Sequence, residues 1–248
     1  MNSLTLLLRI HRGIFFDLYG TLYLYQDEEA ARLALERAMY ERFVANGLQL
    51  PFEAFRSALS RFVSDEAPLA LGSGATRFSR RIHRLARRLG LVLSPGQALE
   101  MADELAAIWQ EWLSLDPITL PLLDRLRALD KRLALTTGFD HPPHVRRVLA
   151  EDGLNERFEA VLIADALDAE RARRTLFELA LERLGLRASE TMYVGTAPTA
   201  INAARLTGLT PLQIVRDPKP IADRAFPEGT PLQIGSLEAL LEAAEVLL

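Results

Sequence analysis

The chain has 248 residues, which is enough for one large domain, or for a core with a smaller second unit, and for a well-buried interior. Its 29 basic and 33 acidic side chains leave a formal net charge of −4, so nothing favours nucleic acid or a membrane surface as a partner. Because the chain has no cysteine, disulfides and thiolate metal sites are excluded.

The first ten residues contain an apolar run at 4–8, followed closely by Arg9, His11 and Arg12. This run is too short to span a membrane, and it lacks the basic start and the cleavage site of a secretory leader. We therefore expect a cytoplasmic protein, either a monomer or a homodimer.

The stretch at 13–22 combines a strand pattern with a reactive side chain. Apolar, β-branched and aromatic residues fill 13–16, Asp17 ends the run, and Gly20 permits the positive φ of a sharp turn. Open α/β sheets bind ligands at the carboxyl ends of their strands, so Asp17 would suit a carboxylate nucleophile. Thr21 could add a hydroxyl donor. A strand that simply ends in an Asx turn explains the same residues.

The segment 25–115 is predicted to form four consecutive helices. Acidic residues at 27–29 open the first helix, where they interact favourably with the helix dipole. The second helix is expected at 52–63, the arginine-rich third at 76–89, and the fourth from Pro95 to about residue 115. A plain helical bundle explains these four helices but not the strands that follow.

From residue 117 onward, helix and strand patterns alternate. Helices are expected at 120–129, 143–152, 173–184, 197–206 and 237–248, and strands at 132–136, 160–164, 191–194, 211–215 and 231–234. Alternation at this spacing implies right-handed crossovers and a parallel sheet. We therefore predict an α/β protein whose sheet has the strand before Asp17 at its centre.

The run at 17–22 resembles the first motif of the haloacid dehalogenase superfamily, which is Asp-x-Asp-x-Thr in its phosphatases. Asp17 and Thr21 match, whereas Tyr19 replaces the second aspartate, a form typical of the metal-free dehalogenase branch. The resemblance implies a Rossmann-like parallel-sheet core with an inserted four-helix cap. The implied division of the chain is a core of residues 1–24 and 116–248 and a cap of residues 25–115.

Two further stretches resemble superfamily motifs that supply a hydroxyl and a cation. The strand that ends at Thr136, followed by Thr137 and Gly138, resembles the second motif, in which Thr136 would bind a phosphate or carboxylate oxygen. The resemblance implies that Thr137 and Gly138 also belong to the substrate-binding site. Ordinary turn chemistry explains the same residues. The third motif is a lysine ahead of an apolar helix. The helix pattern at 176–186 matches, and Arg171 stands where the lysine belongs.

The fourth motif, Gly-Asp-x-x-x-x-Asp after a strand, keeps its glycine and loses its acids. Gly195 is followed by Thr196 in place of the first aspartate. At the position of the second aspartate the sequence has Thr199 or Ala200, or that position is deleted. Gly195 and Thr196 are therefore expected to border a binding site without holding a metal.

The missing carboxylates weigh against Mg²⁺, which prefers carboxylate or substrate oxygens in near-octahedral geometry. Without a metal, a phosphate near Asp17 meets a like charge at a cost of about 4 kcal/mol for each pair, at ~4 Å and an effective dielectric of ~20. Asp17 could still attack a monoanionic substrate as a nucleophile, with Thr136 and Arg171 binding the substrate. Hydrolysis of the resulting ester needs a base, which the fourth motif lacks. Charge balance also predicts direct pairing of Asp17 with Arg171.

Two functions fit these residues. The first is a degenerate member of the family without a cofactor, catalytically silent or weak, that keeps its pocket for a small anionic ligand or for partner contact. The second is an active metal-independent hydrolase, dehalogenase-like or an atypical phosphatase, with Asp17 as nucleophile. His141 and His144 could form a metal-binding pair, but we expect a proline-started helix with two solvated imidazoles.

Overall fold

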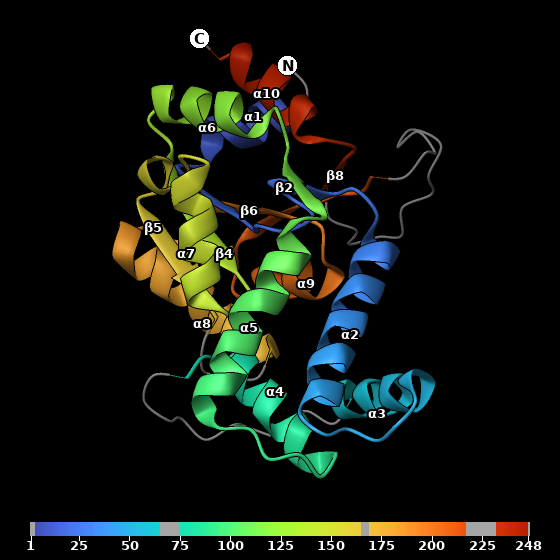
Figure 1. Cartoon of the computed structure of the whole chain (residues 1–248). Coiled ribbons are helices and arrows are strands. Elements are labelled where there is room, and N and C mark those ends of the chain that lie inside the picture. Colours follow the sequence, from blue (N-terminus) through green and yellow to red (C-terminus); the bar gives the residue numbers. More distant parts are fainter. Residues whose placement is uncertain (1–2, 65–74, 165–168, 217–231, 248) are drawn as a thin grey trace.

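The computed structural model describes residues 3–64, 75–164, 169–216 and 232–247, with the side chains of 63–64 and 169–173 outside the described part. Its core is a six-stranded parallel sheet in the order β5-β4-β1-β6-β7-β8 (Figure 1). The strands are β1 (Gly13–Phe16), β4 (Arg132–Thr137), β5 (Ala160–Ile163), β6 (Thr191–Gly195), β7 (Thr210–Ile214) and β8 (Leu232–Ile234). The predicted parallel α/β sheet is confirmed, and β1 has a hydrogen-bonded neighbour on each side.

Helices cover both faces of this sheet. They are α1 (Ser3–Ile10), α6 (Thr119–Ala128), α7 (Pro142–Glu151), α8 (Ala169–Leu184), α9 (Pro198–Leu206) and α10 (Leu237–Glu245), with short 3₁₀ turns at Asn155–Arg157 and Ala188–Glu190. Ile14 and Phe16 pack with α1, α6, α7 and α10, while Phe15 packs with α8 and α9 on the opposite face. Successive side chains of a strand alternate between faces, so β1 contributes to both halves of the core.

Four further helices form a cap below the sheet in Figure 1, namely α2 (Glu28–Ala45), α3 (Phe52–Ser64), α4 (Arg77–Arg88) and α5 (Pro95–Gln110). They share a hydrophobic cluster that includes Phe43, Phe55 and Leu85. Local signals start the helices: the Asp27 side chain caps α2, and a capping box with proline at the first turn opens α5.

A two-stranded antiparallel ribbon of β2 (Tyr23–Tyr25) and β3 (Leu113–Leu115) carries the chain into and out of the cap. The fourth cap helix was predicted to continue to about residue 115, but it ends at Gln110 and a strand follows. The ribbon lies at both boundaries of the predicted core and cap, a division that stays a prediction. Helix α1 was not predicted. None of the described helices has the length and apolar character to cross a bilayer.

Candidate functional site

Asp17 directly follows β1, at the carboxyl end of the sheet. Its backbone N–H donates to the carbonyl oxygen of Val194 at 3.0 Å, which extends the β1–β6 pairing by one residue. Its Oδ1 accepts the N–H of Leu18 at 2.9 Å, and the residue is only 7% exposed. The carboxylate is therefore held in a fixed place at the edge where parallel α/β sheets bind ligands.

Two threonine hydroxyls are buried close to this strand end. Thr136 lies on β4, one residue beyond Leu135, which pairs with Phe16 of β1. Among the described residues, neither Thr136 Oγ1 nor Thr21 Oγ1 has a hydrogen-bond partner, although both atoms are buried. A buried polar group left unpaired costs roughly 1–3 kcal/mol. Two such hydroxyls suit a site that takes the oxygen atoms of a ligand.

The other predicted binding residues shape the loops around Asp17. Thr137 Oγ1 accepts the N–H of Phe139 at 3.3 Å and so supports the turn that contains Gly138. Gly195 ends β6, and a Cβ there would lie 2.7 Å from the Tyr193 hydroxyl, so only glycine fits without displacing that ring.

The turn after Asp17 touches the loop after β6. Gly20 has φ +76°, and a Cβ on it would lie 2.9 Å from Thr196 Oγ1. The Thr196 carbonyl also accepts the Gln213 side-chain amide at 3.2 Å. The first and fourth motifs therefore meet, and they meet at a hydroxyl rather than at a carboxylate.

Tyr19 stands where the phosphatases of the superfamily have their second aspartate. Its ring packs edge-to-face against Tyr23 and Phe139, with centroids 6.0 Å and 5.1 Å away. Its hydroxyl donates to Gln110 Oε1 of α5 at 3.3 Å. Burial, with a smaller contribution from Tyr25, raises the pKa of the Tyr19 phenol well above its usual value, so the group stays neutral. It therefore supplies no anionic ligand for a cation.

The residues present do not fit the Mg²⁺ site of the superfamily. Across the described ranges, no three His, Asp or Glu side chains gather as a metal would require. Burial raises the pKa of the Tyr25 phenol, and the negative charges of Glu28 and Asp17 raise it further. Neutral phenols and hydroxyls are poor substitutes for the carboxylates that Mg²⁺ needs.

Arg171 lies in the first turn of α8, which begins at Ala169 rather than at the predicted residue 173. Its side chain is outside the described residues. The predicted pairing of Asp17 with Arg171 therefore stays a prediction.

The prediction that His141 and His144 are solvated is wrong. Their exposed fractions are 0% and 1% because the cap covers the start of α7. His141 Nδ1 lies 2.9 Å from Thr76 Oγ1, and its Nε2 lies 2.9 Å from Asp103 Oδ1. His144 Nε2 lies 3.4 Å from Gln110 Oε1, at the same seam between cap and core.

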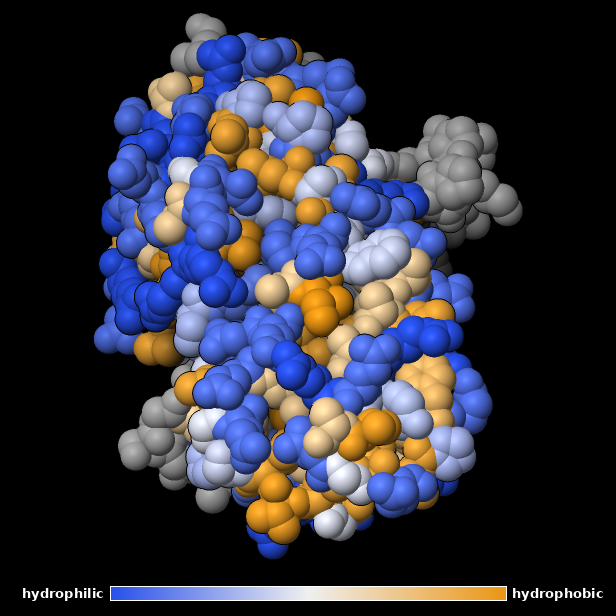
Figure 2. All heavy atoms as spheres, viewed as in Figure 1, coloured by the Kyte–Doolittle hydropathy of each residue, from blue (hydrophilic) through white to orange (hydrophobic). Residues whose placement is uncertain are grey.

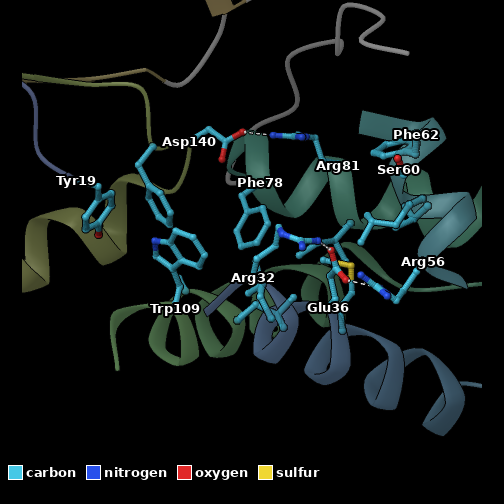
Figure 3. A pocket seen from close by; sticks show the side chains of 18 of the residues that line it. Tyr19, Arg32, Glu36, Arg56, Ser60, Phe62, Phe78, Arg81, Trp109 and Asp140 are labelled. Carbon is cyan, nitrogen blue, oxygen red and sulfur yellow. Dashed lines mark hydrogen bonds and ion pairs between the residues drawn. The ribbon is translucent and has the colours of Figure 1, made fainter. Parts of the chain in front are cut away.

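A cavity of about 1000 Å³ lies between the four cap helices and the loop after β4 (Figure 3). Tyr19, Gly138 and Phe139 border it on the core side, and Trp109 borders it from α5. Sequence analysis singled out only Tyr19 and Gly138 among these residues. The others have no local signal, because they meet only when the cap folds over the core.

Comparisons with known proteins agree with this architecture. The family model described as haloacid dehalogenase-like hydrolase matches residues 11–208. The chain is 27% identical over 191 residues to ribulose-1,5-bisphosphate 5-phosphatase of Halopiger xanaduensis, covering 74% of this chain and 75% of that protein. It is also 27% identical over 205 residues to (S)-2-haloacid dehalogenase of Pseudomonas sp. strain YL, with 79% of each chain covered.

Solved structures of both kinds share the fold. The HAD phosphatase from Thermococcus onnurineus aligns with a TM-score of 0.62 at 23% identity, over 95% of this chain and 97% of that one. The 2-haloacid dehalogenase from Pseudomonas syringae pv. Tomato DC3000 aligns with a TM-score of 0.62 at 22% identity, over 96% and 100%.

Proposed function

Because the chain belongs to the haloacid dehalogenase-like hydrolase family, we propose that it is a member whose metal site has degenerated. In this proposal it is catalytically silent or weak and binds a small anionic ligand at the carboxyl end of the sheet, around Asp17. Thr21 and Thr136 provide hydroxyls for oxygen atoms, and Arg171 provides the positive charge that would offset Asp17.

The position of Tyr19 carries this proposal. Its hydroxyl donates to Gln110 of the cap, and its ring is held by two aromatic neighbours. The side chain that replaces a metal-binding aspartate is thus used for packing between cap and core. With Thr196 at the other acidic position, a phosphate would meet the charge of Asp17 without a shielding cation.

The second candidate is a metal-independent hydrolase with Asp17 as nucleophile. It is favoured by the fixed carboxylate and by the unpaired Thr136 hydroxyl beside it. In such a reaction an Asp17 oxygen forms an ester bond to the substrate carbon while halide leaves with its bonding electrons. Water must then cleave the ester, and the phenols of Tyr19 and Tyr25 are too firmly protonated to act as its base.

One experiment separates the two candidates. The purified protein and Asp17→Asn are incubated with 4-nitrophenyl phosphate or (S)-2-chloropropionate, each with Mg²⁺ or with EDTA. Released product and intact protein mass are both measured. The proposal of a silent or weak site expects no adduct and at most slow turnover, whereas a stalled nucleophile accumulates an ester that Asp17→Asn abolishes. Turnover that depends on Asp17 at about 1 s⁻¹ or faster, the ordinary range of enzymes, would contradict the proposal.

A further inference from the structure

We propose that the cavity between the cap helices and the loop after β4 binds the uncharged, apolar body of a ligand, such as a medium-length alkyl chain. This inference goes beyond the proposed function because it concerns the cap rather than Asp17. It holds whether or not Asp17 reacts with anything.

The size and position of the cavity suit an elongated occupant. Its volume of about 1000 Å³ is at the upper end of ordinary ligand sites. In Figure 3, Tyr19 and Trp109 lie toward one side, while Phe62 and Arg56 of α3 lie toward the other. On the face seen in Figure 2, hydrophobic side chains gather between α5 and α2, two of the helices that line the cavity.

Much of the lining is apolar. The aliphatic and aromatic side chains include Leu35, Met39, Leu59, Phe62, Phe78 and Ile82. Removing apolar surface from water is favourable and is roughly proportional to the area buried. A cavity of this size with such walls is therefore better filled by a hydrocarbon than by a small polar ion.

The charged residues of the wall neutralise one another. Glu36 accepts from both Arg32 and Arg56, at 2.7 Å in each case. Asp140 pairs with Arg81 at 3.2 Å. Glu53 lies 3.4 Å from Arg56, so the described lining holds three arginines and three carboxylates.

This balance leaves no net charge on the described wall to attract an ionic group. A charged ligand head inside the cavity would lose hydration and would have to compete with an existing ion pair of the wall for its partner, which is costly. The part of the ligand that enters the cap should therefore be uncharged. The guanidinium groups and Ser57 can still donate hydrogen bonds at its edge.

The test compares 1-decanol with decanoate, which have the same chain length and differ in charge. Binding is followed by calorimetry. We expect 1-decanol to bind at one site and decanoate to bind roughly tenfold or more weakly. 1-Octanol should bind roughly 15-fold more weakly than 1-decanol, because each buried methylene contributes about a fourfold factor.

Two variants locate the binding inside the cap. Leu59→Trp fills the cavity and should weaken 1-decanol binding at least tenfold. Leu206→Trp, at a residue 48% exposed on α9 and outside the lining, should leave binding unchanged. Glu36→Gln removes the carboxylate shared by Arg32 and Arg56, so decanoate should become the better of the two probes. Glu104→Gln is its control, since the Arg42–Glu104 pair is about half exposed and outside the lining.

Three results would overturn the inference: no 1-decanol binding by the unaltered protein, a preference for decanoate, or binding that neither Leu59→Trp nor Glu36→Gln alters. If Leu59→Trp fails to fold, the inference is decided by whether the Glu36→Gln variant binds decanoate more tightly than 1-decanol. None of these measurements involves Mg²⁺ or turnover, so their failure is distinguishable from failure of the proposed function.

Discussion

His141 Nε2 lies 2.9 Å from Asp103 Oδ1, so a fully buried imidazole of the core pairs with a half-exposed carboxylate of cap helix α5. The other ring nitrogen reaches Thr76, which caps α4. The neighbouring Asp140 carbonyl accepts the N–H of Phe78 at 3.1 Å. One short segment of the core thus holds two cap helices in place.

His141→Ala should destabilise the protein by roughly 2 kcal/mol, because it removes a fully buried ring together with its hydrogen bonds to Thr76 and Asp103. Urea unfolding measures the loss. His83→Ala, at a half-buried histidine on α4, is the control and should cost less than ~0.5 kcal/mol. In a double-mutant cycle with Asp103→Ala, the effects should be less than additive. Equal costs for the two histidine variants would contradict the role given to His141.

His144 should make stability depend on pH below neutrality. Burial, followed by the charges of Arg147 and His141, lowers the pKa of His144 from 6.5 to about 4. Between these values the unfolded chain binds a proton that the folded chain does not, so stability falls as pH drops from 6.5 toward 4. Allowing for solvent screening, the loss is about 2 kcal/mol at most.

Unfolding measured at pH 7 and pH 4.5 checks this slope. His144→Asn should flatten it, whereas His83→Asn should leave it unchanged. A slope that survives in His144→Asn would assign the effect to other groups.

Asp17 and Arg171 are expected to pair directly, so removing one charge leaves the other partly buried. Arg171→Gln should destabilise by ~3–5 kcal/mol if the site is dry. Adding Asp17→Asn should cost less than the sum of the two single changes. Arg174→Gln, at an exposed position of the same helix, is the control. Strictly additive effects in thermal or urea unfolding would count against the pair.

Restoring the missing acids should create a Mg²⁺ site. Tyr19→Asp combined with Thr196→Asp returns carboxylates to two positions beside Asp17, and carboxylate oxygens are what Mg²⁺ requires. Calorimetric titration should show stoichiometric binding in this variant and none above background in the unaltered protein. Tyr19→Phe combined with Thr196→Val controls for lost packing. A tight Mg²⁺ site in the unaltered protein, abolished by Asp17→Asn, would show that other side chains supply the metal ligands.

Gly20→Ala should cost more stability than Gly47→Ala. Both glycines have positive φ, which costs a residue with a side chain roughly 1–2 kcal/mol. A Cβ at Gly20 would also meet Thr196 Oγ1 at 2.9 Å, whereas one at Gly47 meets nothing within 4 Å. Urea unfolding should therefore show a larger loss for Gly20→Ala. Thr196→Ala should recover part of it, and equal costs would exclude this contact as the cause.

The sequence by itself determined the parallel α/β core, because each of its signals is local. Alternating helix and strand patterns and the short run before Asp17 identify the strands, and right-handed crossovers then order the elements. The strand predicted at 191–194 is observed at Thr191–Gly195. The motif at 17–22 pointed to the family for the same reason, since it occupies six consecutive residues.

Only the tertiary structure decided how the cap meets the core. The ribbon joins Tyr23–Tyr25 to Leu113–Leu115, a pairing between segments far apart in sequence that no short pattern encodes. His141 and His144 look like a solvated helix start locally, yet α4 and α5 cover them. Burial depends on which distant surfaces come together, and that follows from the packing of the whole chain rather than from any one segment.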